Sequence, residues 1–265
     1  MSIWSPVPRP SGGPRLSRTV LIVEVVLVLA LSLGRSAVYS VVDLISALLA
    51  AEPLSSQQAV LNGSLAPGRP WLDLTLQVLG IAFRLTPVLL VGYLLWRTGD
   101  DVRRLFLGPD RRGRYGGDVV RGALLALGVG SVGIGFYLFT RELGVNLTVV
   151  AEDLPGTWWR YPLLVASAAQ NALLEECVVV VYLLTRLRQI GLSPRASLLV
   201  SAGLRGSYHL YQGFGGFVGN AVMGLLFGWL YQRWGRVVPL VAAHTFLDIG
   251  AFLGYAILAD RVSWL

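Results

Sequence analysis

The 265-residue chain contains no lysine, a single cysteine and only two histidines. The lone Cys177 excludes an intrachain disulfide framework and a cysteine-rich zinc site. Charged residues make up only 14% of the sequence, whereas hydrophobic residues make up 54%. The mean hydropathy of +0.63 is too high for a soluble domain of this length, so we predict an integral membrane protein.

Long apolar segments occur seven times along the chain. Crossing a hydrocarbon core of about 30 Å takes about 20 helical residues. The segments lie at residues 19–42, 73–96, 118–140, 161–184, 196–212, 216–232 and 237–258. The fifth and sixth are short and meet at a glycine-rich join. Because apolar residues run continuously rather than alternate, we predict an all-α polytopic bundle of about seven transmembrane helices.

The basic residues, all of them arginine, gather in alternate connections. These connections hold Arg9, Arg15 and Arg18 before the first span, Arg97, Arg103, Arg104, Arg111, Arg112 and Arg114 after the second, Arg186, Arg188 and Arg195 after the fourth, and Arg233 and Arg236 after the sixth, whereas the intervening connections hold few basic residues. The positive-inside rule then predicts a cytoplasmic N-terminus and a C-terminus outside. The net charge of +7 follows from this topology, so we expect no nucleic-acid binding.

Three regions are predicted along the chain. Residues 1–18 form a basic arm rich in proline and glycine, which favours no stable helix. The apolar run that follows exceeds the roughly 7 to 15 residues of a signal-peptide hydrophobic region, so we expect a retained first span. Residues 19–140 are predicted to form a three-helix membrane region, and residues 160–258 a core of four transmembrane helices.

Ionisable residues inside the predicted spans single out the last four spans. Each such residue costs about 2.5 to 3.5 kcal/mol at the bilayer centre on insertion scales. In the earlier spans, Glu24, Arg35 and Arg84 are expected to pair with one another or with other polar groups of the bundle. The later spans contain Glu175, Glu176, Arg205, His209, His244 and Asp248, including both histidines of the chain.

Helical spacing pairs several of these residues. His244 and Asp248 are four residues apart and therefore share one face of a helix, and so do Arg205 and His209. The two adjacent glutamates diverge by about 100° around the helix axis. At most one of them can point squarely at a given site, so we expect them to have different roles.

The set of residue types allows two kinds of hydrolytic site. A carboxylate with two histidines in a shielded cavity can activate water and stabilise an oxyanion. Alternatively, two imidazoles and a carboxylate can hold a divalent metal such as zinc. The candidate ligands are Glu175, His209, His244 and Asp248. Spacing alone leaves both possibilities open, and a single histidine could also make a purely structural hydrogen bond across the bundle.

The order of these motifs resembles the CPBP family of intramembrane proteases. The resemblance rests on a Glu-Glu pair in one span, a helix that ends in histidine, and a later His-x-x-x-Asp, and it covers about residues 160–256. The family includes the type II CAAX prenyl endopeptidases and bacterial bacteriocin-processing and immunity-related proteins. The resemblance therefore implies an intramembrane endopeptidase, with or without a metal, in the C-terminal part of the chain.

The resemblance also implies a role for each site residue. Glu175 would activate the attacking water, and Glu176 would support the site through polar contacts. His209 would help to orient and activate that water. His244 and Asp248 would contact the oxyanion or help to hold a metal.

Two departures from the family's motifs are expected to be linked. The arginine of the usual Glu-Glu-x-x-x-Arg is replaced by Val180, and the phenylalanine of the usual Phe-x-x-x-His is replaced by Arg205. We predict that Arg205 supplies from the next helix the guanidinium that Glu176 has lost, so the two side chains should lie closer than about 6 Å. Asp248, where many relatives have asparagine, should be protonated, orient His244 or bind a metal, because an ionised carboxylate only accepts hydrogen bonds.

Three functions are compatible with these residues. The leading hypothesis is a membrane-embedded peptidase with a peptide or membrane-protein substrate, in the cytoplasmic membrane of a bacterium. The lysine-free composition is typical of a GC-rich bacterial genome, and prenylation is chiefly eukaryotic, so a CAAX substrate is not expected. The second hypothesis is a non-catalytic scaffold or immunity protein that binds a peptide or partner with the same fold. A proton-coupled transporter is disfavoured because inverted repeats are absent.

Overall fold

The computed structural model describes residues 16–108, 115–259 and 261–262. Most of the basic arm predicted at residues 1–18 lies outside them. The helices are α1 (Arg18–Ala30), α2 (Leu33–Leu49), α3 (Pro70–Arg84), α4 (Thr86–Arg97), α5 (Val102–Leu107), α6 (Tyr115–Glu142), α7 (Arg160–Glu175), α8 (Leu183–Ile190), α9 (Pro194–Ser207), α10 (Phe214–Trp234) and α11 (Val238–Leu258). A π-helix, η2 (Glu176–Tyr182), joins α7 to α8.

The chain forms a helical membrane bundle, as predicted. Among the described residues, five helical segments are long and apolar enough to cross a membrane: Pro70–Arg97, Tyr115–Glu142, Arg160–Ile190, Phe214–Trp234 and Val238–Leu258. The bent pair α1 and α2 adds a sixth if it is one span. The count of seven is not confirmed, because α9 has only 14 residues and is about 21 Å long.

The first predicted span, 19–42, is divided by a bend of 55° between α1 and α2. At the bend, the Ser32 hydroxyl donates to the carbonyl of Val28, four residues earlier. Gly34 lies so close to the preceding turn that a Cβ there would be 2.8 Å from the Leu29 carbonyl oxygen. A serine and a glycine near the break are a common cause of a helix kink, and together they explain why one apolar run forms two helices.

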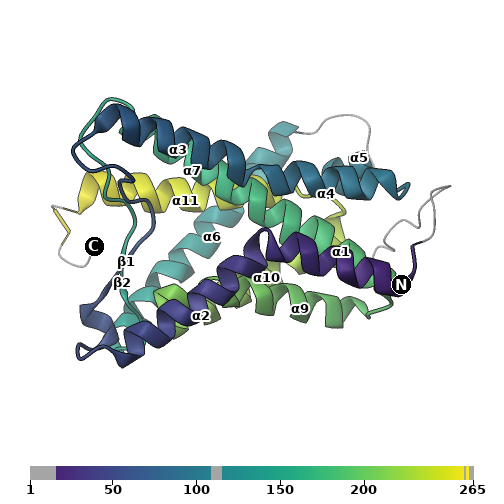
Figure 1. The fold of residues 1–265 in the computed structure, drawn as a ribbon, viewed down its shortest axis with the longest axis horizontal. Helices are drawn as coiled ribbons and strands as arrows, with labels where there is room; N and C mark the ends of the chain where they lie inside the picture. Colours follow the sequence, from purple (N-terminus) through teal and green to yellow (C-terminus); the bar gives the residue numbers. More distant parts are fainter. Residues whose placement is uncertain (1–15, 109–114, 260, 263–265) are drawn as a thin grey trace.

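The continuous helix from α7 through η2 to α8 is the most buried of the five spans. Helices α3 and α11 pack against its first half, while α9 packs against η2 and α8. Helix α6 contacts α10 and α11 and runs diagonally between the upper and lower helices in the view of Figure 1. The ionisable residues of the C-terminal spans are therefore brought together around one central helix.

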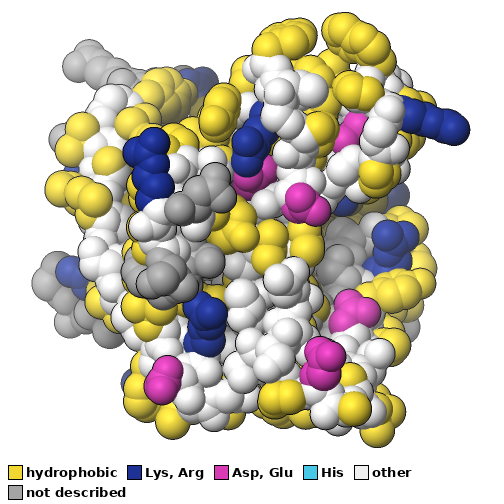
Figure 2. All heavy atoms as spheres, turned by 90° about the vertical axis from the view of Figure 1, so that its left-hand side faces the viewer, with side chains coloured by type: hydrophobic (Ala, Val, Ile, Leu, Met, Phe, Trp, Pro, Cys, Tyr) yellow, Lys and Arg dark blue, Asp and Glu magenta, His cyan; other side chains and the backbone are white. Residues whose placement is uncertain are grey.

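One end of the bundle carries a small cap of loops and short strands, which we define as residues 50–69 and 143–159. Its two strands, β1 (Gln58–Val60) and β2 (Thr148–Val150), pair in parallel. The cap end is the left side of Figure 1, and Figure 2 shows that it exposes side chains of both charge signs. The start of α1 and helix α5 lie at the other end, where the arginine-rich connections are. The placement of the arginine-rich connections at one end agrees with the positive-inside pattern of the sequence. The orientation of the protein in the membrane stays a prediction.

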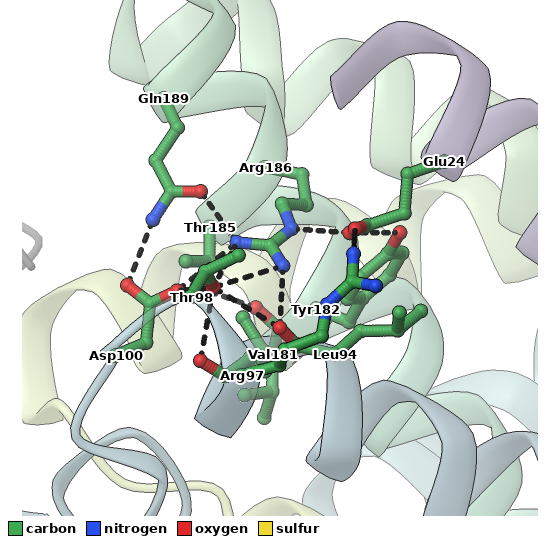
Figure 3. A network of polar contacts seen from close by, with 11 residues as sticks. Glu24, Leu94, Arg97, Thr98, Asp100, Val181, Tyr182, Thr185, Arg186 and Gln189 are labelled. Carbon is green, nitrogen blue, oxygen red and sulfur yellow. Dashed lines mark hydrogen bonds and ion pairs between the residues drawn. The ribbon is translucent and has the colours of Figure 1, made fainter. Parts of the chain in front are cut away.

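A buried ionic network holds α8 to α1 and to the end of α4 (Figure 3). Arg186 is fully buried; its Nε lies 2.7 Å from Glu24 Oε1 and its Nη1 lies 3.0 Å from Asp100 Oδ2. Arg97 and the Tyr182 hydroxyl also contact Glu24. Glu24 thus pairs with other polar groups of the bundle, which is one of the two outcomes expected from the sequence.

Replacing Arg186 by methionine is expected to destabilise the fold by about 3 to 5 kcal/mol, because Glu24 and Asp100 would stay buried without their counter-charge. The free energy of unfolding in mixed detergent micelles measures this loss. Arg195→Met is the matched control, since Arg195 is exposed. Equal stability of the two variants would show that the network contributes nothing.

Candidate active site

The two adjacent glutamates lie where the central helix changes its geometry. Glu175 ends α7, and Glu176 begins the seven-residue π-helix η2. Such π-helical segments occur frequently at functional sites. The side chain of Glu175 is 12% exposed, whereas that of Glu176 is fully buried. The two acids therefore occupy different environments, as the divergence of adjacent helical residues requires.

Arg205, from α9, lies between the two carboxylates. Its Nη1 is 2.8 Å from Glu176 Oε1, and its Nη2 is 3.4 Å from Glu175 Oε2. This confirms the predicted contact between Arg205 and Glu176. Helix α10 makes room for the guanidinium: a Cβ on Gly224 would lie 3.1 Å from Arg205 Cδ, and the Phe227 ring lies 5.4 Å below it.

His244 is held by the fully buried glutamate. Its Nδ1 lies 2.8 Å from Glu176 Oε1, the same oxygen that accepts from Arg205. The same Nδ1 lies 3.2 Å from Arg205 Nη2, so it can donate to Glu176 when it carries a hydrogen and accept from Arg205 when it does not. The other ring nitrogen, Nε2, lies 3.6 Å from Asp248 Oδ1. Glu176 and Arg205 thus hold one edge of the His244 ring, and Nε2 lies on the side of Asp248, the more exposed side of the site.

His209 lies in the turn that follows α9, next to the short helix η3 (Leu210–Gln212). Its Nδ1 is 2.9 Å from the backbone carbonyl of Arg205, which can only accept, so Nδ1–H donates. Its ring lies between those of Tyr208 and Tyr211, with centroids 4.7 and 6.4 Å away. In the neutral ring, Nε2 is then the basic nitrogen.

Two residues of the site were missed in the sequence. The Tyr208 hydroxyl donates to Glu175 Oε2 at 2.8 Å, and Asn171 Nδ2 donates to Asp248 Oδ2 at 3.3 Å. Asn171 precedes Glu175 by four residues, so helical spacing could have placed it on the same face. Nothing in the sequence signals Tyr208, because the packing of α9 on the central helix decides where its hydroxyl points.

The structure brings the predicted residues together as one cluster of contacts. Arg205 joins both glutamates, Glu176 joins His244, and His244 lies beside Asp248. His209 is joined through the backbone of Arg205. Exposure rises across the cluster, since the Asp248 side chain is 21% exposed and the Arg205 side chain is sealed.

The predicted metal ligands do not fit a metal site in this arrangement. Among the described residues, no three or more His, Cys, Asp or Glu side chains form a group that could hold a metal ion. The Arg205 guanidinium occupies the space between the carboxylates, where it would repel a cation. His244 Nδ1 is already engaged by Glu176. We therefore assign no step to a metal.

These features define a helical membrane protein in which the central helix and two neighbouring segments bring together a buried cluster of carboxylates, an arginine and histidines. A family model described as type II CAAX prenyl endopeptidase Rce1-like matches residues 157–250, so this segment is similar to that family. The match, over roughly a third of the chain, confirms the CPBP family predicted from the motifs, and it includes every candidate site residue. No curated protein and no solved structure matches the chain significantly.

Proposed function

We propose that the protein is an intramembrane endopeptidase in which Glu175 activates the attacking water. The observation that carries this proposal is the environment of Glu175. Its Oε2 accepts from Tyr208 and faces Arg205, and the hydrogen bonds and ion pairs of the described residues leave Oε1 without a partner. A positioned carboxylate with one oxygen left for water is suited to act as a general base.

His209 is proposed to orient the water. Its Nδ1–H is committed to the Arg205 carbonyl, which leaves Nε2 as an acceptor for a water proton. Glu175 takes the proton as the water oxygen bonds to the scissile carbonyl carbon. When the tetrahedral intermediate collapses, the same carboxyl group returns the proton to the leaving amine, so that the cycle ends with Glu175 ionised again.

His244 and Asp248 are proposed to stabilise the oxyanion together. In this proposal Nδ1–H of His244 donates to Glu176, so the ring can donate to an oxyanion only from a protonated Nε2. The Asp248 carboxylate, 3.6 Å from Nε2, favours that protonated ring. Aspartate would thus act through His244 where the asparagine of many relatives donates directly. This accounts for the departure without a metal.

The scaffold hypothesis loses its main support from the geometry. It rested on the replacement of the motif arginine by Val180, yet Arg205 lies 2.8 Å from Glu176. The substrate is proposed to be a peptide or a membrane protein, reached within the bilayer. Location in the cytoplasmic membrane of a bacterium is proposed from the lysine-free composition.

Peptide cleavage by the purified protein tests the proposal. We expect the parent to cleave a quenched fluorescent peptide, either prenylated at a C-terminal CAAX sequence or containing one membrane span. Glu175→Ala and His209→Ala should lose cleavage, while the exposed control Glu52→Ala should keep it. The metal content is measured alongside, and chelators should leave the rate unchanged. An inactive parent that still binds the peptide would favour the scaffold.

A further inference from the structure

The turn that follows His209 is bonded to a loop of the cap. The Leu147 N–H donates to the Gln212 carbonyl at 3.1 Å, and the Phe214 N–H donates to the Val145 carbonyl at 3.0 Å. Asn146 and Gly213 form an antiparallel bridge between these bonds. The same loop continues directly into β2, so the turn beside the site is connected to the strand pair of the cap.

Asn146 uses both ends of its amide at this junction. Its Oδ1 accepts from the N–H groups of Gly215 and Gly216, at 2.8 and 3.3 Å, and so caps the start of α10. Its Nδ2 donates to Thr140 Oγ1 at 2.9 Å, near the end of α6. The residue is only 3% exposed. One buried side chain thus joins the cap loop, α6 and α10.

The glycines of the turn allow this close approach. A Cβ on Gly213 would lie 2.6 Å from the Val145 carbonyl oxygen, and one on Gly215 would lie 2.6 Å from Thr140 Oγ1. A Cβ on Gly216 would lie 2.8 Å from the carbonyl oxygen of His209. Gly216 therefore contacts both residues: its N–H donates to Asn146, and its Cα lies against the backbone carbonyl of His209. A displacement of Asn146 is expected to move Gly216 and, through it, the His209 backbone.

We propose that Asn146 is a positioning residue that fixes the orientation of the His209 ring. Within the part of the chain that the structure describes, the His209 ring makes two aromatic ring contacts and one hydrogen bond at Nδ1, and the residue follows the end of α9. The position of its backbone depends on the turn that Asn146 holds. The expected effect on catalysis rests on the proposed function, in which His209 orients the water. The expected effect on the orientation of the ring is independent of that function.

The two-histidine sequence makes the ring directly observable. With ¹⁵N-labelled histidine the spectrum contains signals from His209 and His244 alone, and it distinguishes Nδ1–H from Nε2–H. His244→Gln identifies the His209 signals by elimination. In the parent we expect His209 as the Nδ1–H tautomer. In Asn146→Ala its ¹⁵N signals should broaden or shift toward averaged values, while those of His244 stay in place.

Cleavage gives the second readout. Asn146→Ala should lower kcat by about 10- to 100-fold with KM within about twofold, because a displaced histidine misorients the water without removing substrate contacts. Thr140→Val, which removes the acceptor of Nδ2 but leaves the Oδ1 bonds of Asn146 to the glycine turn, should give a smaller loss in the same direction. Asn62→Ala is the matched control, since this cap asparagine bonds to Ala151 and Ser167 and not to the turn.

Gly216→Ala tests the same contact if Asn146→Ala does not fold. Unchanged His209 signals in both folded variants would overturn the proposal. An equal change of the signals in Asn62→Ala would also overturn it, since a general loosening of the cap would then be the cause. If the parent itself cleaves nothing, the proposed function fails, and the ¹⁵N spectra still decide the role of Asn146.

Discussion

Glu175→Gln is expected to lower the rate of peptide cleavage by about 10²- to 10⁴-fold, the usual contribution of a general base. The amide has the same shape and can still accept from the Tyr208 hydroxyl, so the fold should be kept. It cannot take a proton from water, and therefore the loss should fall on kcat rather than KM. Single-turnover cleavage under saturating enzyme measures the chemical step directly.

Glu176→Gln is the matched comparison, because it makes the same replacement of one carboxylate oxygen by an amide NH2 group in the neighbouring acid. Glu176 is sealed from solvent and holds Arg205 and His244. Its amide variant should lower the stability of the protein and disturb the His244 signals, while cleavage stays measurable. A Glu175→Gln variant as active as the parent would contradict the assignment of the base. Equal kinetic losses in the two variants would show that the glutamates act as one unit.

The contact between Arg205 and Glu176 could be predicted from sequence because of the cost of a buried charge. A carboxylate at membrane depth needs a partner, and Val180 stands where the family's arginine would provide one. Arg205 is the basic residue one turn before His209 in the next helix. The pairing of His244 with Asp248 follows in the same way from their four-residue spacing.

Other parts of the molecule have no comparable signal in the sequence. The strands β1 and β2 have three residues each and lie in two connections far apart in the chain. Periodicity cannot identify segments so short. The bend between α1 and α2 interrupts one continuous apolar run, and the π-helix η2 lies within another. Hydropathy predicts that such a run is helical but not where it bends or widens.

Asn146 shows why polar residues of the cap escape prediction. In the sequence it is an asparagine in a connection, a common loop residue. Its significance arises only when α6 and α10 bring Thr140 and the glycine turn to opposite ends of its amide. Tyr208 is similar, since its hydroxyl reaches Glu175 while its carbonyl accepts from Ser40 of α2. Both residues join elements that are distant in sequence.

Arg205→Phe restores the residue that the family has at this position, yet it is expected to be the most damaging substitution of the site. Glu176 and Glu175 would stay buried without their shared counter-charge, at a cost of about 3 to 5 kcal/mol. Repulsion between the two acids would favour protonation of one of them. We therefore expect loss of cleavage and a lower midpoint of unfolding, measured by activity and by thermal denaturation in detergent.

The double variant Val180→Arg/Arg205→Phe tests whether the two departures are linked. Val180 is buried in the π-helix four residues after Glu176, so an arginine there could return a guanidinium to the glutamate from its own helix. Val180→Arg alone should be destabilising, because it adds a second cation next to Arg205. If the departures compensate each other, the double variant is more stable and more active than either single variant. Additive losses would instead show that Arg205 supports the site in a way that an arginine at 180 cannot replace.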